Sequence, residues 1–230
     1  MAEAEFDAFT ASYREQHQAS VAFGGFELDY FARYKADIAK QRCTKAGLSP
    51  SRIMDFGSGM GNALKPLRSA FPAARIDCVD VSAESLRECR AQGVPNSFTQ
   101  HYDGKNLPYD DGTFDLAFTA CVFHHIPEAD HVMLLTDIRR CLAPKGKMIL
   151  FEHNPLNPLT RLAVARCPFD EHAVLIRAGE MKRRFDAAGF SSAGVHFRLF
   201  MPGFLSGLRG LENYMEWIIF GAQYYVDADL

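Results

Sequence analysis

Four ionisable side chains stand at the ends of two apolar segments of this 230-residue chain. His124 and His125 follow "FDLAFTACVF", and Glu152 and His153 end "KMILFEH". Imidazole and carboxylate groups act as general acids or bases when their pKa lies near the working pH. Their position after strand-like runs makes all four candidate catalytic groups. The alternatives are core packing for the two adjacent histidines, and capping and turn formation around Pro155 for the other pair.

A glycine-rich segment, "IMDFGSGMGN", places Gly57, Gly59 and Gly61 directly after another apolar run. A strand, a glycine turn and a helix bring backbone N–H groups to a ligand at the carboxyl ends of an open α/β sheet. This arrangement predicts a nucleotide or nucleoside ligand. The dinucleotide fingerprint G-x-G-x-x-G would need its third glycine at position 62, which is Asn62. The spacing therefore disfavours a nicotinamide dinucleotide.

An acidic side chain follows the next strand-like run, because Asp80 lies 19 residues after Gly61. A carboxylate in this place can accept charge-assisted hydrogen bonds from both hydroxyls of a ribose. The G-x-G-x-G spacing, Asp55 just before it and Asp80 after it together resemble motif I and the following acidic loop of class I S-adenosylmethionine-dependent methyltransferases. The resemblance implies that S-adenosylmethionine is the cofactor, with the glycine backbone beneath its methionine part and Asp80 on its ribose.

The resemblance continues through residues 102–118, "YDGKNLPYDDGTFDLAF". This stretch is similar to the family segment in which an acid, here Asp103, reaches the adenine amino group and in which a Phe-Asp pair, here ending in Asp115, anchors the sheet. "FEHNPLNPLTR" resembles a bacterial subset of small-molecule methyltransferases, within the group that includes the quinone-biosynthesis enzymes. The residues implied for cofactor binding are Asp55, Gly57, Ser58, Gly59, Gly61, Asp80, Val81, Asp103, Gly104, Ala120, Cys121 and Tyr34.

The elements that must position these groups alternate between strand and helix from Arg52 onward, which indicates βαβ units and a parallel sheet. Strands are expected over residues 52–56, 75–81, 97–102, 114–120, 147–153, 195–200 and 222–228. Helices are expected over residues 62–71, 82–93, 131–142 and 178–190, with "APKG" closing the third. The predicted fold is α/β and Rossmann-like: a doubly wound, seven-stranded, mostly parallel sheet.

Two segments fall outside this alternation. Residues 1–50 are helical in pattern and predict an N-terminal helical cap, followed by one methyltransferase domain over residues 51–230. Residues 154–178 hold three prolines that interrupt regular structure, and their length predicts a substrate-facing insertion. Tyr30, Tyr34 and this insertion are expected to form an apolar chamber over the methyl end of the cofactor. Completion of the core is the alternative.

Composition and charge argue against several classes of function. The net charge is -3 with a pI near 6.2, and the densest basic cluster, Lys182-Arg183-Arg184, fits a solvated helix face, so no nucleic-acid partner is expected. The six cysteines form no C-x-x-C pair, and we expect no metal site. No secretory signal and no apolar run of about 18 residues are present, which predicts a cytoplasmic protein without an integral membrane segment. Peripheral membrane contact through the tail remains open.

The combined prediction is an S-adenosylmethionine-dependent methyltransferase that acts on a small, hydrophobic or aromatic acceptor. A lipid or isoprenoid-quinone acceptor is one alternative. A nicotinamide-dependent oxidoreductase and a non-catalytic cofactor-binding domain are the alternatives of other classes. The sequence leaves the acceptor atom, the general base and the oligomeric state open.

Overall fold

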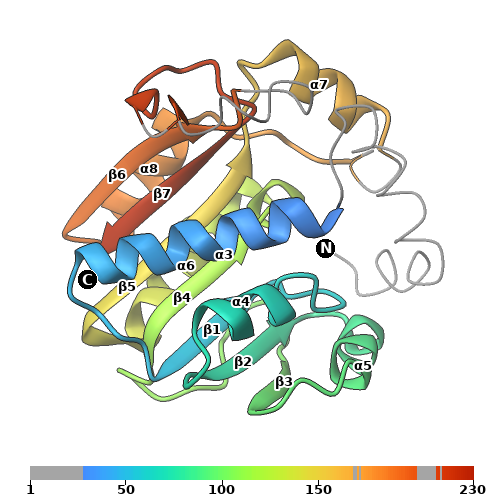
Figure 1. Cartoon of the computed structure of the whole chain (residues 1–230), viewed down its shortest axis with the longest axis vertical. Coiled ribbons are helices and arrows are strands. Elements are labelled where there is room, and N and C mark those ends of the chain that lie inside the picture. Colours follow the sequence, from blue (N-terminus) through green and yellow to red (C-terminus); the bar gives the residue numbers. More distant parts are fainter. Residues whose placement is uncertain (1–27, 168–169, 171, 201–210, 213) are drawn as a thin grey trace.

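A seven-stranded sheet forms the centre of the structure (Figure 1). The computed structural model describes residues 28–167, 170, 172–200, 211–212 and 214–230. The strands are β1 Arg52–Phe56, β2 Arg75–Asp80, β3 Ser97–His101, β4 Phe114–Ala120, β5 Leu142–His153, β6 Ser192–Arg198 and β7 Gln223–Asp229. Their order is β3-β2-β1-β4-β5-β7-β6, and β7 alone runs against its neighbours. The predicted seven-stranded, mostly parallel fold is confirmed.

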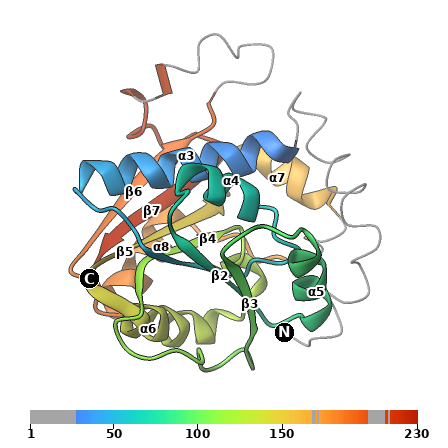
Figure 2. The ribbon, with the colours of Figure 1, turned by 60° about the horizontal axis from the view of Figure 1, so that its bottom comes forward.

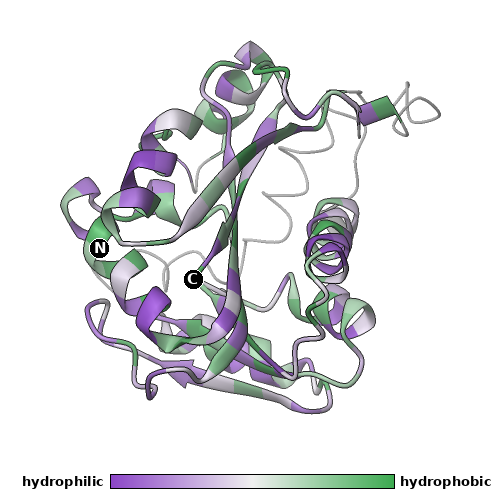
Figure 3. Ribbon diagram, turned by 90° about the vertical axis from the view of Figure 1, so that its left-hand side faces the viewer, coloured by the Kyte–Doolittle hydropathy of each residue, from purple (hydrophilic) through white to green (hydrophobic). Residues whose placement is uncertain are grey.

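Helices cover both faces of this sheet (Figure 3). They are α3 Leu28–Lys45, α4 Leu64–Ala70, α5 Ala83–Ala91, α6 His131–Cys141, α7 Pro158–Ala165 and α8 Ala178–Ala187. Buried side chains of α3, α4 and α5 form one apolar cluster with the sheet, and those of α6 and α8 form a second. Neighbouring strand residues divide between the two, as Ile53 and Met54 do, because side chains of a strand alternate between its faces.

Strand β5 is longer than predicted, and this corrects the interpretation of "APKG" as the end of a helix. Helix α6 ends at Cys141, and β5 begins directly at Leu142, which pairs with Phe114. The register then shifts, so that Lys147 pairs with Leu116. A Cβ on Gly146 would lie 2.9 Å from the carbonyl oxygen of Ala143, so this irregular stretch has no room for a side chain there. The four residues therefore form a bulge at the start of the strand.

The 154–178 insertion contains a helix, α7, where the prolines were expected to interrupt regular structure. Pro158 occupies the first helical turn, where its missing N–H costs nothing. The side chain of Asn157 caps the helix by accepting a hydrogen bond from the backbone N–H of Thr160 at 3.0 Å. A proline in this place starts a helix instead of breaking one.

Helix α3 is the described part of the predicted N-terminal cap, and it crosses one face of the sheet (Figures 1 and 2). It buries Ala36, Ile38, Ala39 and Cys43 in the cluster that it shares with α4 and α5. Residues 1–27 lie outside the described residues, so the division into a cap and one domain stays a prediction. In the part of the chain that the structure describes, no helix combines the length and apolar character needed to cross a bilayer.

Candidate active site

The predicted site residues gather at the carboxyl ends of β1 to β5 in two adjoining groups. The first, which we call the glycine edge, comprises residues 55–61, 80–81 and 103–104 at the ends of β1, β2 and β3. The second, the histidine edge, comprises residues 120–125, 152–153 and 170 at the ends of β4 and β5 and after α7. Because parallel strands end on the same side of a sheet, the fold brings both groups together.

The three glycines differ in what surrounds them, although all three have positive φ angles. A Cβ on Gly57 would lie 2.5 Å from the side chain of Val122, and one on Gly61 would lie 2.7 Å from Sγ of Cys89. Those two glycines therefore allow the turn to pack against its protein neighbours. Among the described residues, a Cβ on Gly59 would meet no atom within 4 Å. Of the three, Gly59 is the position where the backbone faces open space that a ligand can occupy.

Asp80 braces this glycine turn. One carboxylate oxygen accepts the backbone N–H of Gly59 at 2.7 Å, and the other accepts that of Ser82 at 2.9 Å. Burial raises the pKa of Asp80 above its ordinary value, whereas these N–H donors oppose the shift. The carboxylate keeps lone-pair capacity for a further donor. The geometry therefore fits the predicted ribose contact, with the carboxylate already held in place.

Asp55 is a second acid at the same edge, and unlike Asp80 it is buried. Its side chain is 3% exposed, and its Oδ2, like the hydroxyl of neighbouring Ser58, has no hydrogen-bond partner among the described residues. Burial and, second, the charge of Asp80 raise the pKa of Asp55 to about 7. An unpartnered carboxylate oxygen in a buried place is costly unless a donor reaches it. The ammonium of an amino-acid moiety would provide such a donor.

Asp103 and Gly104, which the resemblance assigns to the adenine, lie shortly after the end of β3. The backbone N–H groups of Lys105 and Asn106 both donate to Oδ1 of Asp103 at 2.9 Å, which lowers the pKa of this exposed carboxyl. A Cβ on Gly104 would lie 3.7 Å from Val81, so the ends of β2 and β3 are in contact here. The remaining oxygen, Oδ2, is the atom of Asp103 that stays available for a ligand amino group.

Cys121 follows Ala120 in the histidine edge. Its backbone φ is 60°, a value that residues other than glycine rarely adopt. Its thiol lies 3.2 Å from the ammonium of Lys35 on α3 and 3.8 Å from the amide of Gln223 on β7. Burial by itself would raise the pKa of the thiol, but the charges of Lys35 and His153 lower it to about 6. These two charges therefore favour the thiolate form of Cys121.

Glu152 and His124 form a buried ion pair at the centre of the histidine edge. Oε2 of Glu152 lies 2.6 Å from Nδ1 of His124, and Oε1 accepts the backbone N–H groups of Val122 and Phe123. Burial opposes both charges, yet their attraction lowers the pKa of Glu152 to about 2 and raises that of His124 to about 10. Both oxygens of Glu152 are thus engaged, which favours a positioning role, and its catalytic role stays a prediction.

Asp170 joins this pair from the segment after α7. Its Oδ1 lies 3.4 Å from Nε2 of His124 and 3.4 Å from Nε2 of His125. The two imidazoles lower the pKa of Asp170 although burial raises it. The ring of His153, the fourth candidate, lies 5.3 Å from that of His124. The structure therefore brings all four predicted groups together.

Three residues of the site were missed by sequence reasoning, and one predicted residue has a different contact. Lys35, Gln223 and Asp170 come from segments far from the motifs, and their spacing carries no signal. Tyr34 was predicted to bind the cofactor, but its hydroxyl donates to Glu212 at 3.3 Å. Its role at the cofactor stays a prediction.

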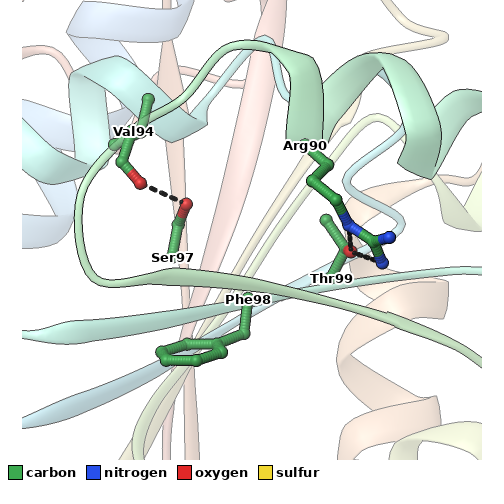
Figure 4. A pocket seen from close by; sticks show the side chains of 5 residues that line it. All are labelled: Arg90, Val94, Ser97, Phe98 and Thr99. Carbon is green, nitrogen blue, oxygen red and sulfur yellow. Dashed lines mark hydrogen bonds between the residues drawn. The ribbon is translucent and has the colours of Figure 1, made fainter.

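A shallow hollow of about 260 Å³ lies elsewhere, between α5 and β3 (Figure 4). Its lining consists of Arg90, Val94, Ser97, Phe98 and Thr99, and Arg90 donates to the hydroxyl of Thr99 within it. No residue of the glycine edge or of the histidine edge lines this hollow. It is therefore separate from the candidate active site.

Comparisons with known proteins agree with this geometry. Residues 53–146 match a family model described as a methyltransferase domain. The demethylmenaquinone methyltransferase of Thermus thermophilus is 31% identical over 111 residues, which cover 46% of this chain and 49% of that protein. The trans-aconitate 2-methyltransferase of Methylobacterium nodulans is 26% identical over 178 residues, which cover 74% of this chain and 67% of that protein. A solved SAM-dependent methyltransferase of Thermotoga maritima has the same fold, with a TM-score of 0.67 at 20% identity over 98% of both chains.

These matches and the fold confirm the predicted resemblance to class I S-adenosylmethionine-dependent methyltransferases, and they agree with the predicted enzyme class and cofactor. The chain spans about half or less of the length of the first curated relatives that it matches. The names of two relatives give different acceptors, demethylmenaquinone and trans-aconitate. These similarities therefore leave the acceptor of this chain open.

Proposed function

We propose that this protein transfers a methyl group from S-adenosylmethionine to a small acceptor molecule. The observation that carries the proposal is the pair of acids at the glycine edge, of which Asp55 is buried and Asp80 is half-buried. Asp80 accepts the backbone N–H groups of Gly59 and Ser82 and keeps lone-pair capacity for a ribose diol, and Asp55 has a buried oxygen with no hydrogen-bond partner among the described residues. Asp80 could bind a ribose diol and Asp55 an ammonium group. This pair of carboxylates therefore fits a nucleoside that carries an amino-acid moiety. A nicotinamide dinucleotide has a ribose but no such ammonium.

The chain contributes to this reaction by positioning and by excluding water. When bound, the cofactor supplies a methyl group on a sulfonium, and the transfer is an in-line displacement in which charge disperses. Cys121 and Lys35 line the end of β4, where the resemblance places the methionyl sulfur, and Glu152 holds His124 beside them. The buried pair of Glu152 and His124 holds this end of the site in place and shields it from bulk water.

For the acceptor, we propose a hydrophobic or aromatic small molecule. Two apolar features support it: Leu156 and Leu159 are exposed in the 154–178 insertion, and the rings of Tyr30 and Tyr34 stack with centroids 5.9 Å apart.

A lipid or isoprenoid-quinone acceptor is the second candidate, favoured by the exposed Phe220. The backbone carbonyl of Phe220 accepts a hydrogen bond from the side-chain amide of Asn157, so the segment that carries Phe220 adjoins the start of α7. A peripheral membrane contact of a cytoplasmic enzyme would follow from this candidate.

The cofactor is tested by thermal unfolding with S-adenosylmethionine, S-adenosylhomocysteine and NAD in parallel. A ligand at a hundred times its Kd adds about 2.7 kcal/mol, which for a chain of this size raises Tm by about 5–10 °C. We expect this shift with the first two ligands only. Stabilisation by NAD alone would favour the oxidoreductase and contradict the proposal.

Turnover is tested by measuring the release of S-adenosylhomocysteine with phenolic, quinone-like, amine and nucleic-acid acceptors. We expect turnover with acceptors of the first two kinds. Activity confined to charged or polymeric acceptors would overturn the apolar pocket. Cofactor binding without turnover on any acceptor would favour the non-catalytic alternative.

A further inference from the structure

Three side chains of the histidine edge lie close enough together to share an ion. Among the described residues, His124, His125 and Asp170 form a group whose ligand atoms all lie within 4.8 Å of one another. The atoms that face each other are Nε2 of both imidazoles and Oδ1 of the carboxylate. They come from the turn after β4 and from the segment after α7, which the fold brings side by side. The backbone N–H of Val174 donates to the carbonyl oxygen of His124 at 2.8 Å and ties the two segments together.

The distances within this group fit metal coordination better than hydrogen bonding. Each imidazole nitrogen lies 3.4 Å from the same oxygen of Asp170, beyond the usual N–H···O range of about 2.7–3.2 Å. Two ligands of one tetrahedral ion, with bonds of about 2.0–2.1 Å, lie about 3.3–3.4 Å apart. One oxygen placed equally from two imidazole nitrogens is compatible with a shared ion.

Glu152 determines which nitrogen of His124 faces the group. Its carboxylate lies 2.6 Å from Nδ1, so Nε2 points to Asp170. A histidine that binds a metal usually donates its other ring N–H to a carboxylate or a carbonyl in this way. The side chains of His124 and Glu152 are 1% exposed, and those of His125 and Asp170 are 14% and 13% exposed. The group is therefore shielded from bulk water without being closed.

We propose that His124, His125 and Asp170 bind a divalent transition-metal ion of the zinc class at the carboxyl end of β4. Three protein ligands leave a fourth position for water or for a polar atom of the acceptor, as in catalytic zinc sites. This departs from the expectation of no metal, which rested on the absence of a C-x-x-C pair. That an acceptor would occupy the fourth position rests on the proposed function. The binding of the ion by the three side chains does not.

The test is a titration of chelator-stripped protein with Co²⁺ and with Zn²⁺. The visible absorption of four-coordinate Co²⁺ reports geometry, and competition with a chromophoric chelator reports affinity for Zn²⁺. We expect one ion per chain. Asp170→Asn and His125→Gln each remove a ligand and weaken binding by more than about 100-fold, and Glu152→Gln weakens it by about 10–100-fold. His101→Gln, the same substitution outside the group, leaves the affinity unchanged.

Absence of the four-coordinate Co²⁺ spectrum in the wild type overturns the site, whatever the variants do. So does equal affinity in the wild type, Asp170→Asn and His125→Gln, with folding of each verified by circular dichroism. Either result leaves a hydrogen-bonded network of histidines and acids. Since the titration uses neither cofactor nor acceptor, a negative result does not touch the proposed methyl transfer.

Discussion

The glycine edge and the histidine edge lie at the same side of one sheet, yet they are built in different ways. At the glycine edge, backbone groups form the site: two backbone N–H groups hold Asp80, and the space beside the Cα of Gly59 is open among the described residues. At the histidine edge, side chains hold one another, as Glu152 and His124 do, and Lys35 reaches Cys121 from another element. The glycine edge therefore suits a ligand that is the same throughout a family, such as a cofactor. At the histidine edge, substitution of a few side chains could change which acceptor binds.

The largest difference between the edges is expected in folding stability. Glu152→Gln removes the charge that the buried His124 requires, and breaking such a pair costs about 3–5 kcal/mol. We expect the free energy of unfolding, from urea denaturation, to fall by that amount. Glu84→Gln is the matched control, because its pair with Arg87 is exposed and contributes about 0–1 kcal/mol. Equal losses in the two variants would show that the buried pair does not hold the histidine edge.

Two substitutions in the glycine turn separate packing from ligand space. Gly57→Ala places a Cβ 2.5 Å from Val122 in a left-handed conformation, so strain and overlap together should cost about 2–4 kcal/mol. Gly59→Ala introduces only the conformational strain, so its free energy of unfolding, from urea denaturation, should fall by about 1–2 kcal/mol.

Calorimetry with S-adenosylhomocysteine complements these unfolding measurements. We expect Gly59→Ala to weaken binding although it costs less stability, because its methyl group enters the open space. Unchanged affinity in Gly59→Ala would mean that the cofactor does not pass this glycine.

The smallest effect concerns Cys121, whose pKa is lowered to about 6 from the ordinary 9.0. Alkylation of this thiol by iodoacetamide should reach half its maximal rate near pH 6, as followed by mass spectrometry of the peptide. Lys35→Met should raise this midpoint by at least about one pH unit, which corresponds to about 1.4 kcal/mol. Cys141, whose pKa burial raises to about 11, is the internal control. A midpoint that does not move would remove Lys35 from the environment of the thiol.

The two edges also differ in how far the sequence predicts them. The turn at Gly57–Gly61 and the acid at Asp80 were predicted because they belong to contiguous strand–turn–helix units, in which spacing determines geometry. Asp170 and Lys35 were not, because only tertiary packing brings them to β4. The same limit applies to Lys182-Arg183-Arg184, which was interpreted as a solvated face. Arg184 is in fact buried and paired with Glu128 at 2.9 Å.

Binding of S-adenosylhomocysteine to the wild type and to Asp80→Ala, measured by calorimetry, tests the central claim most directly. We predict one site per chain, and a loss of about 1.5–3 kcal/mol in the variant, since hydrogen bonds to a charged group disappear. Asp115→Ala is the control, because this acid accepts backbone N–H groups of Ser51 and Arg52 at the opposite end of β1. It should keep its affinity. Equal affinity in the wild type and Asp80→Ala, or no binding by either protein, would contradict the assignment of the glycine edge as the cofactor site.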